Sequence, residues 1–508
     1  MAAERTLGVL GFIAVAVLVC GVALSPVGRP ALAGSDLSVP GDVNCSGTAN
    51  SIDAALLLQF SAELLSTLGC SQNADVGEYN RINAIDAALV LQYSAGLLDH
   101  LETAQGQPPA NPPDAAVTHL AAGTFFTCAL TAGADVRCWG ENLSHSLGVR
   151  RTCFPLAYLG VACSTVPVDV QGLAEDVTVV SAATGNHSGH ACVLTLAGGV
   201  KCWGYNYWGQ LGDGTATDRG TPVDVLGLTD GAVAIAMGGY HSCALVDDGD
   251  PNTIGYGAKC WGENVFGNLG SGITNTGYAS PVDVQGLTTG VFAITGGLYH
   301  TCALVDDGDA AQSGHRVKCW GYNNFGKLGD GTEGESNVPV DVVWNDQWGG
   351  VVDIVAGGRF TCALTTPGGV KCWGDNERGQ LGDGTTTGSA TPVDVMGLQS
   401  GVVGITAGGY HACAMTSGGG LKCWGQNARG QLGDGTTTDS ATPVDVIGLE
   451  SSVVGVVAGF LHTCAWTDEG KAKCWGRNLE GQLGDGTTTD RSTPVDVVGL
   501  AAGPGAAP

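Results

Sequence analysis

Short apolar runs alternate with polar, glycine-rich turns through most of this 508-residue chain. One unit of the pattern begins with VVGITAGG at Val402 and continues with CAMTSGGGLKCWG at Cys413. It ends with GQLGDGTTTD and PVDV. Apolar runs of this length, bounded by Gly, Thr, Ser and Asp, are typical of β-strands joined by tight turns. The pattern therefore predicts a mainly β protein built from many short strands.

The unit occurs seven times along the chain. A Cys-Trp-Gly tripeptide marks each copy and places seven tryptophans in register: Trp139, Trp203, Trp261, Trp320, Trp373, Trp424 and Trp475. Successive copies lie about 50 to 64 residues apart, which favours propeller blades over solenoid coils. Tryptophan supplies the bulk that packs one blade against the next.

The cysteines of the chain fall into neighbouring pairs once Cys20 is set aside. Seven pairs flank the turn of a repeat: Cys128–Cys138, Cys192–Cys202, Cys243–Cys260, Cys302–Cys319, Cys362–Cys372, Cys413–Cys423 and Cys464–Cys474. Residues equidistant from a hairpin turn face each other, with Cβ atoms about 4.5–5.5 Å apart, near the distance that a disulfide needs. The longer third and fourth pairs are expected to add residues at the hairpin tip and keep this register.

The two remaining pairs are Cys45–Cys70 and Cys153–Cys163, and we predict disulfides there too. Zinc binding is the alternative for the cysteines as a whole. Each repeat offers only two thiolates, however, and C-x2-C spacing is absent. Disulfides in such number indicate an oxidising compartment.

The N-terminus also points to export. The apolar run from Leu7 to Leu24 is followed by Ala31-Leu32-Ala33, which resembles an A-x-A signal-peptidase site. We interpret residues 1–33 as a signal peptide and expect an extracellular or cell-surface protein. The alternative is an uncleaved membrane anchor, since the run is about long enough to span a bilayer.

Composition narrows the function classes. The chain has 83 glycines, 14% charged residues and a net charge of -27. So acidic a chain argues against nucleic acid as a partner, because phosphate binding requires a basic face. Acidity of this kind fits a soluble exported protein or one that holds calcium.

The stretch AGGYHACAMTSGGGLKCWGQNARGQLGDG from Ala407 resembles a repeat of the regulator of chromosome condensation family. This resemblance implies a seven-bladed β-propeller over residues 117–500. It also implies that the last repeat completes a blade begun at the N-terminus, with PVDV at Pro494 pairing near Val117. Family members include a nucleotide-exchange factor, domains of ubiquitin ligases and secreted inhibitors of β-lactamase, so the resemblance specifies the fold better than the function.

Residues 40–98 carry a different, duplicated motif. Its first copy, GDVNCSGTANSIDAALLLQF, has the spacing of a calcium loop with oxygen ligands. The candidate ligands are Asp42, Asn44, Ser46, Thr48, Asn50 and Asp53. The following run places Ile52, Leu56 and Phe60 on one helical face. This loop-helix pair resembles a type I dockerin, which implies a small α-helical, calcium-binding domain that docks onto a cohesin-like protein.

The second copy of the motif departs from the pattern. Asp75, Asn83 and Asp86 match ligand positions, but Gly77 and Tyr79 stand where oxygen ligands are expected. We therefore expect weaker calcium binding there. The alternative is a calcium-stiffened helix pair that only caps the propeller. Residues 99–116 form a proline-rich linker, and an extended spacer favours docking at a distance.

Five repeats place a histidine two residues before the first cysteine of the hairpin: His190, His241, His300, His411 and His462. The other two repeats have Phe126 and Phe360, which replace a packing imidazole but not a ligand or a base. We interpret the histidines as structural. The GDGTTTD loops with Asp383, Asp434 and Asp485 are primarily turns, with calcium binding as the alternative.

Aromatic residues interrupt the regularity of blades two to four. They are Tyr207, Trp208, Phe266, Phe325, Trp344 and Trp348. Aromatics on variable loops are typical interface anchors. We predict that one side of the propeller, centred on these blades, binds a protein or a surface glycan. The alternative is that these rings pack between blades.

Together these features predict an exported, non-enzymatic binding or scaffold protein that docks through its calcium-dependent module. The alternatives are a secreted glycan-active enzyme and a propeller-type inhibitor of a secreted enzyme. An enzyme is the less favoured class, because no acidic pair, nucleophile elbow or metal triad stands apart from the repeat. A membrane contact is expected only if the N-terminal segment is uncleaved.

Overall fold

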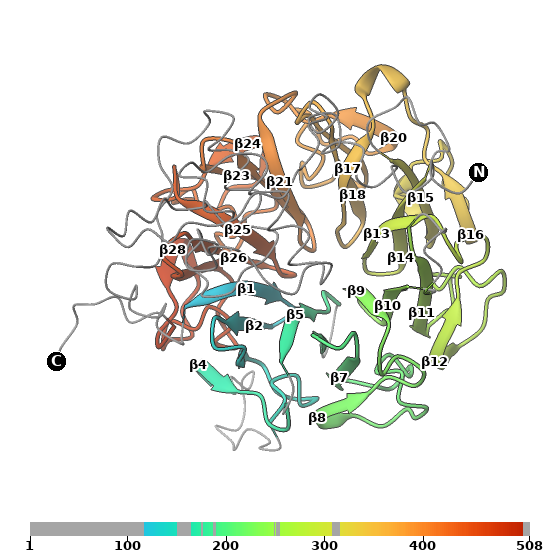
Figure 1. Cartoon of the computed structure of the whole chain (residues 1–508). Helices are drawn as coiled ribbons and strands as arrows, with labels where there is room; N and C mark the ends of the chain where they lie inside the picture. Colours follow the sequence, from blue (N-terminus) through green and yellow to red (C-terminus); the bar gives the residue numbers. More distant parts are fainter. Residues whose placement is uncertain are drawn as a thin grey trace, which may run out of the picture. The chain divides into compact units, whose positions relative to one another are not determined.

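The computed structural model describes residues 116–149, 164–173, 176–185, 189–247, 249, 255–306 and 315–500. In these ranges the chain forms seven antiparallel four-stranded sheets, each made of four consecutive strands. The sheets follow one another around a ring, with the first strand of each sheet nearest the centre (Figure 1). The prediction of a mainly β, seven-bladed propeller is confirmed.

The first three sheets comprise twelve strands. Blade 1 contains β1 (Val117–Ala122), β2 (Phe126–Thr131), β3 (Val136–Gly140) and β4 (Ser164–Asp169). Blade 2 contains β5 (Val177–Ala182), β6 (His190–Thr195), β7 (Val200–Gly204) and β8 (Arg219–Asp224). Blade 3 contains β9 (Ala232–Met237), β10 (His241–Val246), β11 (Gly257–Glu263) and β12 (Gly277–Asp283).

The remaining sheets repeat the same order. Blade 4 contains β13 (Val291–Gly296), β14 (His300–Val305), β15 (Arg316–Gly321) and β16 (Ser336–Asp341). Blade 5 contains β17 (Val351–Ala356), β18 (Phe360–Thr365), β19 (Val370–Gly374) and β20 (Ser389–Asp394). Blade 6 contains β21 (Val402–Ala407), β22 (His411–Thr416), β23 (Leu421–Gly425) and β24 (Ser440–Asp445). Blade 7 contains β25 (Val453–Ala458), β26 (His462–Thr467), β27 (Ala472–Gly476) and β28 (Arg491–Asp496).

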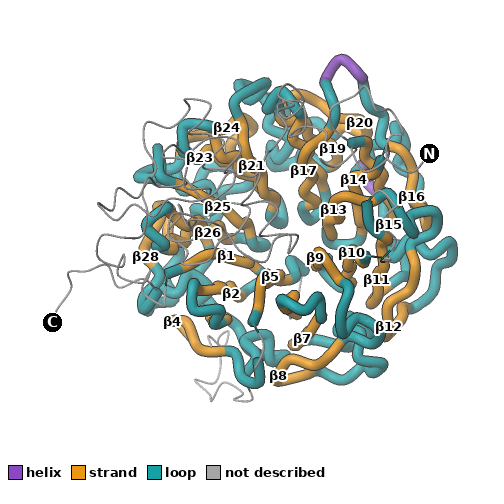
Figure 2. Tube along the Cα trace, in the orientation of Figure 1, coloured by secondary structure: helices purple, strands orange, loops and turns teal. Residues whose placement is uncertain are grey.

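Loops and turns make up almost all of the rest of the described chain (Figure 2). The two helical pieces in the described ranges are short 3-10 turns, η3 (Asn324–Gly326) and η4 (Asp346–Trp348). None of the helices in the described part of the chain has the length and apolarity that a membrane crossing requires.

Each hairpin between the second and third strands contains one of the seven repeat cysteine pairs. The paired cysteines stand directly opposite each other, and disulfides join them with Cα atoms 4.0–4.1 Å apart. Cys243–Cys260 and Cys302–Cys319 keep this register although they are 17 residues apart instead of 10. The extra residues extend the tip only, as the sequence predicts.

The repeat tryptophans join neighbouring blades. All seven are fully buried. Trp424 of blade 6, for example, packs in the core of blade 5 with Cys362 and Leu381. Its Nε1 donates to the carbonyl oxygen of Gln380 at 3.0 Å. Burying a tryptophan this way satisfies its only polar atom and stabilises the contact between blades.

The expectation that PVDV at Pro494 completes a blade begun near Val117 is wrong. Strand β28 pairs with β27, so blade 7 is complete within its own repeat. The chain carries seven whole copies of the four-strand unit, and no strand remains to be exchanged in the described residues. The ring closes instead by packing and by bonds such as Val117 N–H to Gly470 O at 2.9 Å. The first strands of all seven blades line one central cavity of about 310 Å³.

The propeller has two opposite faces, which we name by the strand connections that each one carries. The loop face carries the turns between first and second strands and the connections between third and fourth strands. The hairpin face carries the cysteine hairpin tips and the connections from one blade to the next. Both faces follow from the antiparallel strand order.

Candidate interaction surface

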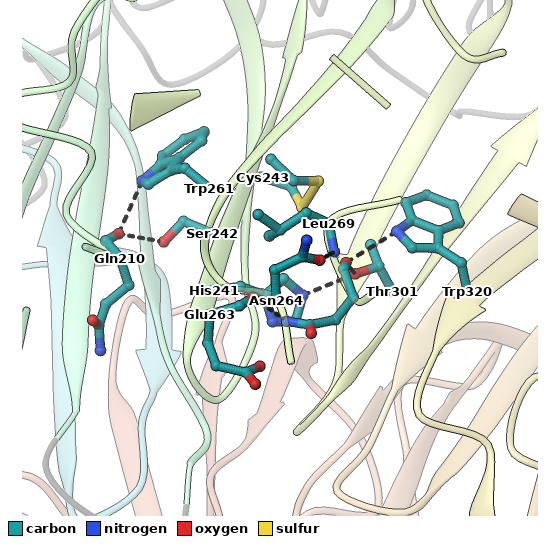
Figure 3. The surroundings of a disulfide bond; sticks show 12 residues. Gln210, His241, Ser242, Cys243, Trp261, Glu263, Asn264, Leu269, Thr301 and Trp320 are labelled. Carbon is teal, nitrogen blue, oxygen red and sulfur yellow. Dashed lines mark hydrogen bonds between the residues drawn. A yellow bond between two sulfur atoms is a disulfide. The ribbon is translucent and has the colours of Figure 1, made fainter. Parts of the chain in front are cut away.

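The five repeat histidines are structural. In blade 3, the Nε2 of His241 lies 2.8 Å from Oγ1 of Thr301 in blade 4 (Figure 3). Thr301 donates its own proton to the carbonyl oxygen of Asn268 at 2.7 Å, so it accepts from the imidazole. Trp320 Nε1 donates to that same carbonyl at 3.0 Å. The histidine therefore belongs to a bridge between adjacent blades.

The same bridge links four other pairs of blades. The bonds are His190–Ser242, His300–Thr361, His411–Thr463 and His462–Thr127, at 2.8–2.9 Å. Where a blade has phenylalanine in place of the histidine, the next blade has alanine in place of the residue that carries the partner hydroxyl. Phe126 of blade 1 is thus paired with Ala191 of blade 2, and Phe360 of blade 5 with Ala412 of blade 6. The residues change as pairs, which is expected of a packing contact rather than of a catalytic base.

Burial keeps these imidazoles neutral. All five side chains have 0% exposure. Burial lowers the pKa of His190, His411 and His462 to about 3 and that of His241 to about 4. Imidazoles with such pKa values carry no charge near neutral pH. Because their side chains are fully buried, they also cannot contact a substrate from solvent.

The aspartates of the GDGTTTD loops hold their own turns. The carboxylate of Asp383 accepts from Thr385 N at 2.9 Å and from Asn376 Nδ2 at 3.2 Å. Asp434 and Asp485 make the equivalent bonds. Groups of three or more His, Cys, Asp or Glu side chains placed to hold a metal ion are not found within the described ranges. The turn interpretation accounts for these loops.

Several predicted site residues lie outside the described residues. They are the calcium-ligand candidates Asp42, Asn44, Ser46, Thr48, Asn50, Asp53, Asp75, Asn83 and Asp86, and the cysteine pairs Cys45–Cys70 and Cys153–Cys163. These assignments stay predictions from the sequence.

The structure divides the six candidate binding aromatics between opposite faces, which corrects the expectation of a single side. Trp344 and Trp348 lie in the connection from blade 4 to blade 5, on the hairpin face. Their rings meet edge to face with centroids 5.2 Å apart, and Lys371 Nζ lies 4.2 Å from the Trp348 ring. Trp344 also packs against the core of blades 4 and 5. For Trp344 and Trp348 the contacts therefore favour packing within the propeller over the role of interface anchors.

The other four candidates lie on the loop face. Tyr207 is 63% exposed and contacts Trp208 edge to face at 4.9 Å. Phe325 is 37% exposed, and Phe266 is half-buried. These rings belong to the connections between the third and fourth strands of blades 2, 3 and 4.

The loop face contains further aromatics that sequence reasoning missed. Tyr240 and Tyr299 immediately precede the structural histidines of blades 3 and 4, and their rings stack at 5.4 Å. Phe266 packs against Tyr299 at 5.3 Å and against Tyr322 at 4.5 Å. The sequence pattern that could have revealed these aromatics is the tyrosine that recurs directly before the repeat histidine, at Tyr240, Tyr299 and Tyr410.

Two cations accompany these rings. Lys327 Nζ lies 4.1 Å from the Tyr322 ring centroid. The Arg359 guanidinium lies between the Phe325 and Tyr410 rings, 5.5 and 5.6 Å from their centroids. Phe266, Tyr299, Tyr322, Phe325, Lys327 and Arg359 line a pocket of about 320 Å³. We call this the loop-face pocket.

Desolvation affects charges in and beside this pocket. Burial lowers the pKa of Lys327 to about 7, and the Arg359 charge lowers it further while Asp375 and Glu335 oppose the shift. Burial raises the pKa of Glu263 to about 7 and also raises that of Tyr299. Rings, an arginine and a buried amine are suited to recognition of an anionic, partly apolar group.

Comparison with known families matches two parts of the chain. Two Regulator of chromosome condensation (RCC1) repeat models match residues 117–150, 232–268, 293–327, 351–380, 402–431 and 453–482, and residues 197–245, 315–364, 367–415 and 419–466. The Dockerin type I domain model matches residues 40–93.

Three curated proteins illustrate the range of similar sequences. The ultraviolet-B receptor UVR8 of Arabidopsis thaliana is 29% identical over 76% of this chain and 83% of its own length. The RCC1 domain-containing protein RUG3, mitochondrial, of the same plant is 31% identical over 61% of this chain and 68% of its own length. The E3 ubiquitin-protein ligase HERC2 of Homo sapiens is 33% identical over 69% of this chain, which spans only 7% of that ligase.

Solved structures share the fold. Human WBSCR16 superposes with a TM-score of 0.60 at 24% identity, covering 72% of this chain and 94% of its own. Yeast RCC1 (Prp20), solved bound to Kap60, superposes with a TM-score of 0.58 at 22% identity, covering 72% of this chain and 83% of its own. At these identities the likeness extends to the propeller architecture alone.

Proposed function

Because the chain belongs to the Regulator of chromosome condensation (RCC1) repeat family, we propose that its propeller is a non-enzymatic module that binds a protein partner through the loop face. The observation that carries this proposal is the cluster of exposed and half-buried aromatics with Arg359 on that face. Tyrosine and arginine are enriched among the residues that dominate binding energy at protein interfaces, and phenylalanine is enriched at interface cores.

The second part of the proposal concerns residues 40–98. This segment acts as a calcium-dependent docking module for a cohesin-like protein, and residues 99–116 separate it from the propeller. The donor set of the first loop fits calcium, because it supplies five side-chain oxygens and one backbone carbonyl at calcium-loop spacing. Asp42, Asn44, Ser46, Thr48, Asn50 and Asp53 would hold the ion.

The protein functions outside the cell or at its surface in this proposal, with residues 1–33 serving as its export signal. Support comes from the seven buried hairpin disulfides, since structural disulfides persist in oxidising compartments. Secretion also places the docking module and the propeller in the same compartment as an exported partner.

Affinity capture from the culture supernatant of the source organism tests the function. The purified full chain is expected to retain a protein through its loop face, and cross-links to that protein should map to the connections of blades 2 to 4. Tyr207→Ala with Trp208→Ala should reduce capture, whereas Trp348→Ala on the hairpin face is the matched control. Turnover of a glycan substrate without a retained protein would contradict the proposal and favour an enzyme.

A further inference from the structure

We infer that the loop-face pocket binds a carboxylate side chain from an acidic, partly apolar segment of the protein partner. This inference rests on the proposed protein-binding function and specifies what the partner presents. The pocket joins two cations, Lys327 and Arg359, with the rings of Phe266, Tyr299, Tyr322 and Phe325. Its volume of about 320 Å³ suits one or two side chains rather than a long ligand.

Lys327 is the one charged residue at its position in the seven blades, where blades 1 and 3 have Ser146 and Asn268. Four other blades place a glutamine at the equivalent position: Gln210, Gln380, Gln431 and Gln482. In each, the amide oxygen accepts a backbone N–H two residues earlier, at 2.8–3.0 Å. An ammonium group cannot accept that bond, so lysine gives up the structural contact at this position.

The Lys327 ammonium also lacks an ionic partner inside the described chain. The residue is 1% exposed, and its Nζ donates to Asn324 O at 3.2 Å. Among the residues that the structure describes, no carboxylate lies within 4.0 Å of this nitrogen. A buried charge without a counter-ion is costly, and an anion entering the pocket would relieve that cost.

Arg359 supplies the second positive charge at the rim. It is 40% exposed at its side chain, and its Nη1 lies 4.0 Å from Asp375 Oδ2, which is the limit of an ion pair. The guanidinium therefore retains donors that a ligand can reach. Two cations in one pocket of a chain with net charge -27 give local complementarity to an acidic group.

The Phe325 backbone is a second, independent feature. Its φ of 72° is in the left-handed region, which non-glycine residues rarely adopt. The equivalent Phe266 in blade 3 has no such conformation among the positive-φ residues of the described chain. The 37% exposed Phe325 ring lies 5.5 Å from the Arg359 guanidinium and lines the same pocket as Lys327, so an apolar neighbour of the acidic side chain can pack there. Backbone strain of this kind concentrates at functional sites.

An acidic peptide segment fits better than an acidic sugar. A sugar stacks on a bare aromatic face. Here Lys327 lies over Tyr322, Arg359 lies beside Phe325, and Tyr299 stacks on Tyr240. The pocket is thus lined by the Lys327 amine, the partly exposed Arg359 guanidinium and the Phe325 ring, which suit a carboxylate with an apolar neighbour.

The test uses the full chain and an array of capped hexapeptides. Each peptide carries one Asp or Glu beside Leu or Phe, and a counterpart carries Asn or Gln instead. Binding of acidic peptides, with little binding of the amide counterparts, is expected. Lys327→Gln should weaken it about tenfold or more, because it removes one partner of a buried charge pair. Since glutamine is native to this position in four blades, the variant is expected to fold.

Arg378→Ala, an exposed arginine on the same face in blade 5, is the matched control and should leave peptide binding unchanged. Phe325→Ala should weaken binding of peptides with an apolar neighbour more than of those without. Binding of oligogalacturonate but not of peptides would overturn the inference in favour of an acidic sugar. Equal peptide binding by Lys327→Gln would overturn the assigned site. A partner captured equally by wild type and Lys327→Gln leaves the proposed function standing and removes only this inference.

Discussion

His462 in the last blade lies 2.9 Å, Nε2 to Oγ1, from Thr127 in the first. Thr127 in turn donates to the carbonyl oxygen of Gln482 at 2.9 Å, and Trp139 Nε1 donates to the same oxygen at 2.8 Å. The junction between the two ends of the propeller thus uses the same bridge as the interior junctions. Side chains, rather than an exchanged strand, close the ring.

The first prediction concerns this bridge. His411→Phe should lower the free energy of unfolding by about 1–3 kcal/mol, because Thr463 loses its donor within a buried contact. Adding Thr463→Ala should recover much of the loss, since the chain already pairs Phe360 with Ala412. Denaturant unfolding of the two single variants and the double variant measures the coupling. Additive effects would contradict a paired packing role.

The second prediction concerns acid stability. The five buried histidines have depressed pKa values in the folded state, so their stabilisation is fully present above pH 6.5. As the pH falls below 6.5, the unfolded chain binds protons that the folded chain excludes. Each histidine then opposes folding by about 1.4 kcal/mol per pH unit until its folded pKa is reached.

Two glutamates act in the opposite direction. Burial raises the pKa of Glu141 and Glu263 to about 7, so the folded state binds their protons more tightly between pH 7 and the ordinary value of 4.5. The histidines outnumber them, and a net loss of stability below pH 6.5 is expected. Thermal unfolding across this range measures it. A variant with the His411→Phe and Thr463→Ala pair should show a shallower slope.

The third prediction is that non-reducing peptide mapping of the protein finds nine local disulfides. Seven are the hairpin bridges, and two are Cys45–Cys70 and Cys153–Cys163. Replacing Cys413 and Cys423 by alanine should cost about 2–3 kcal/mol, as expected for a short closed loop. Free thiols at several hairpins in protein recovered from outside the cell would contradict export.

The fourth prediction concerns calcium. Asp42→Ala with Asp53→Ala should abolish calcium-dependent stabilisation of residues 40–98, because both carboxylates leave the predicted first loop. Isothermal titration of the full chain measures the binding. Asp75→Ala with Asp86→Ala is the comparison and should have a smaller effect, since the second loop lacks oxygen ligands at Gly77. Unchanged calcium binding in the first variant would rule out that loop.

The fifth prediction concerns the stability cost of Lys327. Its folded pKa of about 7 lies below the ordinary value of 10.5, so the cost appears as the pH falls from 10.5 and is complete below 7. Lys327→Gln should therefore raise the thermal midpoint, and by more at neutral pH than at pH 10. Arg359, Asp375 and Glu335 are the charged groups that act on the same amine. An unchanged midpoint at neutral pH would show that the amine is not destabilising.

The sequence reveals the blades because their chemistry is local. Cysteines that flank a turn specify the hairpin register, so Cys243 and Cys260 remain opposed despite a longer tip. Histidine replaced by Phe126 in one blade already excludes a repeated catalytic role. The partner hydroxyl of each histidine, in contrast, lies in the next blade. It is 52 to 61 residues away for four histidines and 335 residues away for His462, so it becomes visible only when neighbouring blades are placed together.

The loop-face pocket is missed for the same reason. Phe266, Tyr299 and Arg359 come from blades 3, 4 and 5, and the ring of blades brings them together. In the sequence alone, Lys327 looks like an ordinary substitution of the repeat glutamine, and only the structure shows that it is buried. Trp344 and Phe325 look alike as loop aromatics, but an antiparallel sheet sends successive connections to opposite ends, and this separates them.

The self-contained sheets have a consequence for how this molecule can be rearranged. Since every blade is made from consecutive strands, a new start and end placed between any two blades would divide no sheet. Circular permutants opened after Gly227 or after Gly397, both in turns between blades, should therefore retain the ring. Duplication or deletion of a single blade during evolution would likewise leave the sheets of the neighbouring blades intact. Bridges such as His411–Thr463 would then determine which two blades can stand next to each other.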